Sequence, residues 1–226
     1  MKKIFHVPHS SVYIPEKYIN DFIISKEQLE HDAILLCDFR TNEMIDDGII
    51  FPYSRLFCDV ERYNSDLEIM NEIGMGVLYT KNHNLETIRE NPSKEILNYY
   101  IEHHKKLNEI TKNLLETNKE IVFIDLHSYS KEILPYELNK DLTRPEICIG
   151  INKRYNKDLL KKLIYIIEDF GYTYFINEPF IGCLLPSEYI DDERVHGIMI
   201  EIRKDVYDTE ENFDKIKELL KCVREL

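Results

Sequence analysis

The feature that most constrains the fold is an alternation of short apolar segments with longer helical patterns. The clearest apolar segment is EIVFIDL, residues 120–126, which is too apolar for a strand with one face in water, so we expect a central strand covered on both faces. Four other segments predict strands, at residues 3–7, 146–151, 172–176 and 197–203. Helical patterns separate them, at about residues 26–47, 93–118, 153–170 and 209–225. This alternation predicts an α/β fold with a largely parallel or mixed sheet and helices on both faces.

The composition indicates one globular domain over residues 1–226. Apolar residues make up 43% of the chain, and its seven glycines leave few places for a flexible linker. A formal charge of −13 argues against a nucleic-acid partner, because a protein that binds phosphates normally carries a basic stripe.

The chain shows no sign of a membrane or secreted protein. No apolar run approaches the roughly 18 residues of a transmembrane helix, and the N-terminus MKKIFHVPHSS does not read as a signal peptide. The five cysteines are scattered and form no CxxC pair, as expected of a reduced, cytoplasmic protein.

Two histidines stand where predicted strands end. His9 lies in VPHSS and His127 in IDLHSYS, each one or two residues beyond an apolar segment. Ligand sites of such sheets gather at the carboxyl ends of strands, and imidazole is the usual nitrogen ligand of Zn²⁺. Asp125 points to the same side as His127 and could orient it. The alternative, that each histidine is only a polar strand-end residue, stays open on spacing alone.

A site of two histidines needs an acidic third ligand to leave one position open for water. Asp38, in CDFRTNEMIDD, is the best candidate, and Glu43 is the second. The two are five residues apart on the expected helix and do not share a face comfortably. A solvated acidic helix face explains either residue equally well.

Glu201 lies in the apolar segment GIMIEIRKD, where burying a carboxylate is costly unless it is paired or functional. Partial desolvation raises a carboxyl pKa towards neutrality, which suits a general base. Arg203 is two residues on and faces the same side, so a structural Glu–Arg pair is the alternative.

Arg55 and Arg62 bracket RLFCDVER and could bind a substrate carboxylate through their planar guanidinium groups, with surface salt bridges as the alternative. His103 and His104 lie in YYIEHHKKL, where an exposed helical face is the simplest interpretation. We expect structural roles for three more histidines: His6, His31 and His83.

Taken in order, nine segments resemble the N-formylglutamate amidohydrolase family, from about residue 6 to residue 207. They are VPHSS, CDFRTNEM, RLFCDVERYNSD, GMGVLYT, YYIEHHKKL, FIDLHSYS, RPEICIGIN, NEPFIGC and HGIMIEIRKDVY. IDLHSYS and MIEIRKD also resemble segments of the zinc carboxypeptidases. The resemblance implies a single-domain, three-layer sandwich with a mixed central sheet, of the zinc-exopeptidase-like (phosphorylase/hydrolase-like) type.

The resemblance also implies site residues. The metal ligands are His9 and His127, with Asp38 at an acidic position of the family, and Glu201 is the catalytic base. Arg62 is the anchor for a substrate carboxylate. The remaining matches are His104 in the long helix, and Asn177 and Gly182 in an NxPxxG-like loop. The chain departs from the pattern at Glu61, which replaces the usual asparagine beside Arg62 and adds a negative charge there.

The expected function is metal-dependent hydrolysis of the amide bond of an N-formyl or N-acyl amino acid, N-formylglutamate-like, to formate and free amino acid. One Zn²⁺ per chain, Glu201 as base, and Arg55 or His104 beside the developing oxyanion would carry it. The partner is a small molecule, not a nucleic acid or a membrane. The rivals are a carboxypeptidase-like exopeptidase, another N-acyl amino acid amidase, and a non-catalytic metal- or ligand-binding protein.

Overall fold

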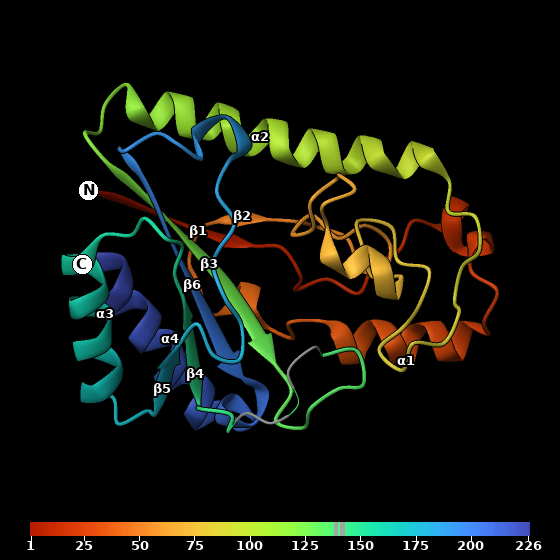
Figure 1. Cartoon of the computed structure of the whole chain (residues 1–226). Helices are drawn as coiled ribbons and strands as arrows, with labels where there is room; N and C mark the ends of the chain where they lie inside the picture. The colour runs from red at the N-terminus through yellow and green to blue at the C-terminus, as the bar shows by residue number, and fades with distance from the viewer. Residues whose placement is uncertain (138–139, 141–142) are drawn as a thin grey trace.

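A mixed sheet forms the centre of the computed structural model, which describes residues 1–137, 140 and 143–226 (Figure 1). Within these residues six strands pair in the order β2-β1-β3-β6-β4-β5. β4 runs antiparallel to β6, and every other neighbouring pair is parallel. The strands are β1 (Lys2–Val7), β2 (Ile49–Ile50), β3 (Ile121–Tyr129), β4 (Ile147–Gly150), β5 (Tyr174–Ile176) and β6 (Val195–Arg203). The predicted mixed sheet is confirmed.

Helices cover both faces of this sheet, as predicted. α2 runs along one face, and α3 and α4 lie together on the other, near both chain termini (Figure 1). Leu107 of α2 packs with Phe123, while Leu163 of α3 and Ile216 of α4 pack with Ile200. The helices are α1 (Lys26–Leu36), α2 (Leu97–Leu115), α3 (Lys157–Asp169) and α4 (Glu210–Glu225). The three-layer α/β sandwich is therefore present.

The central strand is longer than predicted. All nine residues of β3 are buried, which agrees with a strand covered on both faces, but the strand continues to Tyr129. His127 consequently lies inside the strand and not beyond its end. Its backbone pairs in register with Glu201 of β6, so its side chain is fixed more rigidly than that of a loop residue.

The predicted helix over residues 26–47 is wrong in its second half. α1 ends at Leu36, and the backbone N–H of Asp38 donates to the carbonyl of His9 at 2.8 Å instead of continuing the helix. Arg40 then takes a left-handed conformation with φ of 60°. A long-range contact overrides the local helical pattern and places Asp38 in a turn.

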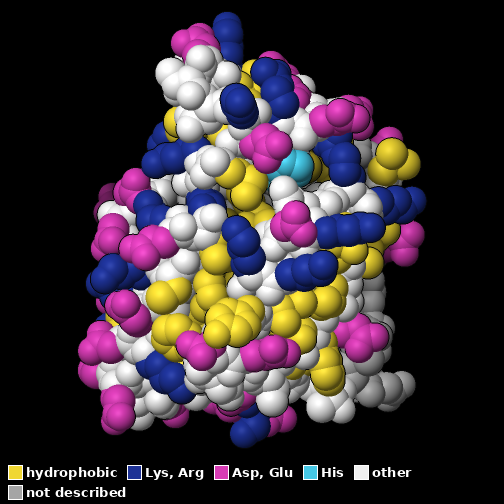
Figure 2. Space-filling view, turned by 90° about the vertical axis from the view of Figure 1, so that its left-hand side faces the viewer, with side chains coloured by type: hydrophobic (Ala, Val, Ile, Leu, Met, Phe, Trp, Pro, Cys, Tyr) yellow, Lys and Arg dark blue, Asp and Glu magenta, His cyan; other side chains and the backbone are white. Residues whose placement is uncertain are grey.

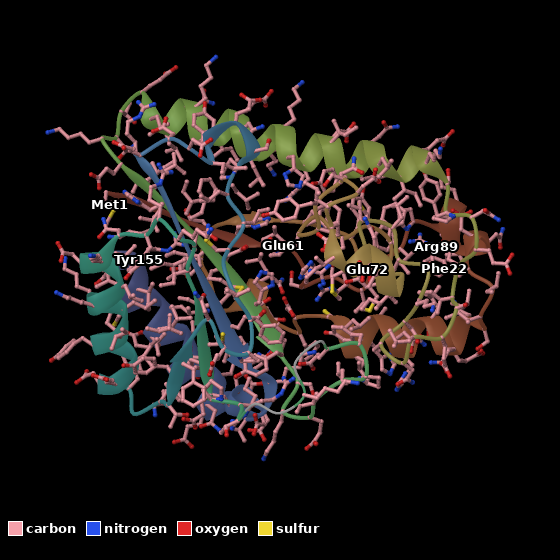
Figure 3. All side chains as sticks on the ribbon, viewed as in Figure 1. Met1, Phe22, Glu61, Glu72, Arg89 and Tyr155 are labelled. Atoms are coloured by element: carbon pink, nitrogen blue, oxygen red, sulfur yellow. The ribbon has the colours of Figure 1, made fainter. Side chains whose placement is uncertain are left out.

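A second hydrophobic cluster lies beside the sheet and supports the loop that follows β2. It joins α1 to residues 51–96, and the buried side chain of Arg89 contacts two of its members, Phe22 and Phe57. Arg89 donates to the carbonyls of Tyr79 and Phe57 and lies over the ring of Phe22, 4.8 Å from its centroid (Figure 3). These contacts hold the RLFCDVER segment in place.

Figure 2 shows one face of the molecule, on the side of α3, and the charges on this face are mixed, as in the sequence. Acidic and basic side chains are interspersed there around apolar side chains, without a continuous basic stripe on that face. No helix among the described residues is long and apolar enough to cross a membrane. The single domain over residues 1–226 stays a prediction.

Candidate metal centre and active site

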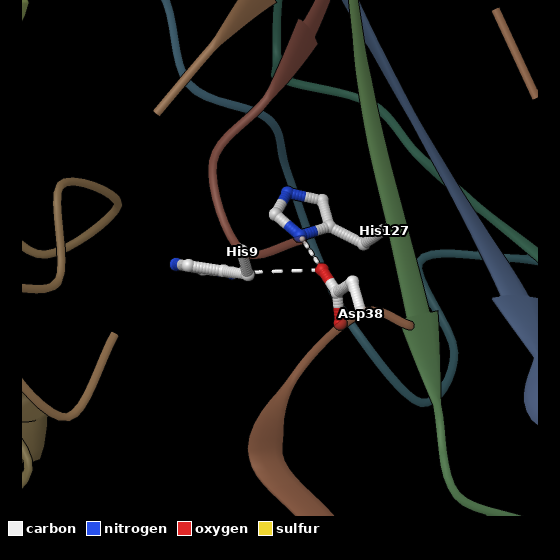
Figure 4. A group of neighbouring side chains, drawn as sticks. All are labelled: His9, Asp38 and His127. Atoms are coloured by element: carbon white, nitrogen blue, oxygen red, sulfur yellow. Dashed lines mark hydrogen bonds and ion pairs between the residues drawn. The ribbon is translucent and has the colours of Figure 1, made fainter. Parts of the chain in front are cut away.

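Three buried side chains converge at the carboxyl ends of β1 and β3 (Figure 4). Asp38 Oδ2 lies 3.0 Å from His127 Nδ1 and 3.6 Å from His9 Nδ1. One ligand atom from each residue fits within 4.8 Å of the others. Among the described residues, His9 Nδ1 is buried without a hydrogen-bond partner. Two imidazole nitrogens, one of them the unpartnered His9 Nδ1, and one carboxylate fit a divalent ion such as Zn²⁺.

The fold explains why these residues meet. β1 and β3 are parallel neighbours, so the chain beyond each strand emerges at the same edge of the sheet. The hydrogen bond from the Asp38 N–H to the His9 carbonyl brings the turn after α1 to that edge. Of the two acidic residues weighed from the sequence, only Asp38 reaches the histidines, because Glu43 is exposed and pairs with Arg40 at 2.9 Å.

A residue that sequence reasoning missed, Asp59, holds His9. The His9 Nε2–H donates to Asp59 Oδ1 at 2.8 Å, which leaves the Nδ1 lone pair for an ion. Asp59 Oδ2 accepts from the Tyr79 hydroxyl at 2.7 Å and from Arg55 at 2.9 Å. Burial raises the pKa of Asp59, but Arg55 and His9 outweigh it and hold that pKa well below its ordinary value. The signal was the position of Asp59 between the two singled-out arginines.

Arg55 and Arg62 form part of the cavity wall and not surface salt bridges. Arg55 shares Asp59 with Tyr79, and the Arg62 Nε donates to the carbonyl of Met75 at 3.2 Å. Arg62 Nε also lies 3.6 Å from an oxygen of Asp59. Both guanidinium groups are thus anchored at one end and face the cavity at the other.

Glu201 faces the same cavity from the neighbouring strand. It pairs in register with His127 and is buried. Desolvation raises the Glu201 pKa to about 7, with His127 lowering it and Asp38 raising it further. The alternative Glu201–Arg203 pair does not form, because Arg203 binds Asp205 at 2.6 Å instead.

The cavity measures about 890 Å³, a size typical of small-molecule sites. Asn177 and Gly182 also line it, both with positive φ. The Asn177 Oδ1 accepts from the N–H groups of Ile151 and Gly182, at 2.8 and 3.2 Å, and so fixes the 177–182 loop. The cavity wall therefore includes the expected metal ligands, base, arginines and loop.

The histidines of α2 differ from expectation. His104 lies 2.9 Å from the carbonyl of Val60 and does not line the cavity, so a role at the reacting carbonyl is not supported and Arg55 remains. Burial lowers the His104 pKa to about 4. His103 is buried and not on an exposed face, and its Nε2 lies 2.9 Å from that of His6. His6 is itself paired, because its Nδ1 lies 2.7 Å from Asp125 Oδ1.

Comparison with solved structures identifies the class of fold. The N-formylglutamate amidohydrolase from Ralstonia eutropha JMP134 aligns over 98% of this chain and 91% of that chain, at 17% identity and a TM-score of 0.80. A gene product from Agrobacterium tumefaciens aligns over 99% of this chain and 89% of that chain, at 19% identity and a TM-score of 0.68. At these identities the likeness shows the fold alone, an α/β sandwich built on a mixed sheet.

The family is shown by a match between the sequence and a model of a protein family. The model described as N-formylglutamate amidohydrolase matches residues 1–208. The chain belongs to the N-formylglutamate amidohydrolase family and is a hydrolase of that family. A comparison with curated proteins found no match.

The raised pKa of Glu201 predicts that the free energy of unfolding of the metal-free protein decreases as pH rises. The folded pKa of about 7 exceeds the ordinary 4.5, so the protonated form contributes stability fully below pH 4.5 and loses it as pH rises through 7. In wild type, ionisation of Glu201 should therefore lower the free energy of unfolding by about 3 kcal/mol across this pH range. Glu201→Gln should abolish that decrease. Urea unfolding with chelator between pH 4.5 and 8 measures it. The exposed Glu43→Gln should keep the wild-type slope, and an unchanged slope in Glu201→Gln would contradict the assignment.

Proposed function

We propose that this chain hydrolyses the amide bond of an N-formyl or N-acyl amino acid to a carboxylic acid and the free amino acid. One Zn²⁺ held by His9, Asp38 and His127 serves this reaction. The observation that carries the proposal is the buried His–Asp–His cluster beside Glu201 in one cavity of a member of this family.

The donor set supports the choice of ion. Two imidazoles and one carboxylate are a common three-residue set of catalytic zinc sites, which keep a further position open. Zn²⁺ bound there supplies Lewis-acid chemistry, polarising a carbonyl and making water more acidic. Asp59 keeps His9 in the tautomer that offers Nδ1 to the ion.

Glu201 moves the protons. Its carboxylate accepts a proton from the attacking water and then delivers it to the leaving amine nitrogen. A pKa near 7 suits both steps, because the group must accept and release a proton at neutral pH. Arg55, which lines the cavity, stabilises the oxygen on which negative charge develops.

Arg62 binds the α-carboxylate of the substrate. Its Nε is fixed by Met75, and among the described residues its terminal nitrogens have no hydrogen-bond partner. A planar guanidinium can therefore hold a carboxylate through two parallel hydrogen bonds and so fix the scissile amide. Asn177 and Gly182 line the same cavity.

Replacing Arg62 with Lys should raise KM for N-formyl-L-glutamate on the order of tenfold and change kcat less. The substitution keeps the charge but loses the two-pronged contact made equally in ground and transition states. Steady-state kinetics measure it, with Arg194→Lys as the control because Arg194 is exposed and its guanidinium pairs with Asp192 among the described residues. An unchanged KM would show that Arg62 is not the anchor.

The rim of the cavity favours a second candidate within the same class. Leu67, Ile69 and Ile181 line the cavity and are exposed, so its mouth is apolar. An amino acid with an apolar side chain, or a longer acyl group, would bury that surface. Measuring the release of free amine distinguishes the two candidates. The substrates are N-formyl-L-glutamate, N-formyl-L-leucine, N-acetyl-L-leucine and a dipeptide. No release from any of them would refute the proposed reaction.

The proposal includes a cytoplasmic location. Its support is that all five cysteines are free, as expected in a reducing compartment.

A further inference from the structure

A second cluster of ligating side chains lies next to the first. His6 on β1, Asp125 on β3 and Glu61 in the loop after β2 bring one ligand atom each within 4.8 Å of the others. His6 Nδ1 lies 2.7 Å from Asp125 Oδ1 and 3.4 Å from Glu61 Oε1. Glu61 lies at the middle of the molecule, where the loops meet the sheet (Figure 3). The cluster joins Glu61, the departure from the family pattern, to His6, for which the sequence predicted only a structural role.

His127 stands between the two clusters. Its Nδ1 faces Asp38, whereas its Nε2 lies 3.6 Å from Asp125 Oδ1 and 3.9 Å from Glu61 Oε2. The side chain is only 6% exposed, and its Nε2 has no hydrogen-bond partner among the described residues. Glu61 Oε1 is likewise buried and unpartnered there. Two orphaned polar atoms therefore point into this second cluster, which is an expensive arrangement unless something binds them.

The balance of buried charge points the same way. Five carboxylates surround the two clusters, and among the described residues the cationic side chains beside them are Arg55, Arg62 and Lys204. The carboxylates are Asp38, Asp59, Glu61, Asp125 and Glu201. Carboxylates gathered in a region with so little solvent are costly to bury unless cations bind between them.

The second cluster has its own supporting contacts. The Leu184 N–H donates to Asp125 Oδ2 at 3.1 Å, and His103 lies against His6 Nε2 at 2.9 Å. Such contacts fix the orientation of ligands, as partners behind metal-binding histidines and carboxylates commonly do. His6 is thereby held with Nδ1 towards the two carboxylates.

We propose that His6, Glu61 and Asp125 form a second divalent-cation site beside the His9–Asp38–His127 site. One imidazole and two carboxylates suit Zn²⁺ or Mn²⁺. Because Glu61 lines the cavity, the second ion borders the space that a substrate fills and adds positive charge beside Arg62. The inference rests on the proposed function only for the occupancy of the first site.

Counting bound ions tests this proposal. The full chain is stripped with chelator, dialysed against Zn²⁺ and analysed for zinc per chain, with circular dichroism to verify folding. Wild type should hold two ions, and Glu61→Gln, which keeps shape but loses charge, should hold one. The control Glu43→Gln should hold two ions, because Glu43 is exposed and pairs with Arg40, which belongs to neither cluster. Glu61→Asn, a smaller amide, should also hold one and replaces Glu61→Gln if that variant misfolds.

The other outcomes separate this inference from the proposed function. One ion in wild type that Glu61→Gln retains would overturn the second site and leave the first standing. One ion that Glu61→Gln loses would support the second site and overturn the first. Two ions without any amide hydrolysis would support the site and refute the proposed reaction. No bound ion would overturn both.

Discussion

Glu201→Gln is expected to lower kcat for amide hydrolysis by about a thousandfold while the zinc content stays at the wild-type value. The amide is nearly isosteric with the carboxylate, but it cannot accept a proton from water or return one to the leaving amine. Glu201 lies on β6, held in register with His127, so the substitution should leave the backbone in place. Steady-state kinetics and metal analysis on the same preparation measure both quantities.

The control for this prediction is Glu43→Gln, which changes the same functional group at an exposed position. It should keep wild-type kcat. If Glu201→Gln retains most of its activity with metal bound, another group is the base. If it loses metal as well, Glu201 is a ligand and not a base.

Asp38→Asn is expected to weaken zinc binding by more than about 100-fold and to abolish hydrolysis at low zinc. Loss of a partner behind a ligand already costs about 10–100-fold in affinity, so loss of a ligand should cost more. Asp38 reaches both histidines, at 3.0 and 3.6 Å, whereas Glu43 binds Arg40. Competition with a chromogenic chelator gives the affinity.

The paired substitution Glu43→Gln decides between the two acidic residues of CDFRTNEM. It should bind zinc like wild type. The reverse result, with zinc lost in Glu43→Gln and kept in Asp38→Asn, would contradict the site described above. High zinc should partly restore Asp38→Asn, because the two histidines remain.

Much of the sheet could be predicted because its strands carry strong local signals. EIVFIDL is apolar on both faces, and β3 is buried along its whole length. His9 and His127 could be placed near each other because the carboxyl ends of neighbouring parallel strands share an edge. Glu201 stood out because a carboxylate within an apolar strand requires a reason.

The remainder depends on contacts between distant segments, which a local pattern does not contain. Asp59 lies 50 residues from His9, and Asp125 lies 119 residues from His6, yet both pairs are hydrogen-bonded. The end of α1 was missed for the same reason, since the His9 carbonyl takes the N–H of Asp38. Glu61 was recognised as a departure from the family, but its approach to His6 could be seen only in the fold.

The most direct test of metal-dependent hydrolysis is one assay on protein purified without chelators. Formate release from N-formyl-L-glutamate, and amine release from N-formyl-L-leucine, are measured as purified, after chelation and after Zn²⁺ is restored. We predict bound zinc, hydrolysis of at least one substrate, its loss on chelation and its recovery with Zn²⁺. Hydrolysis that survives complete removal of metal, or protein that binds no ion and hydrolyses neither substrate, would contradict the account.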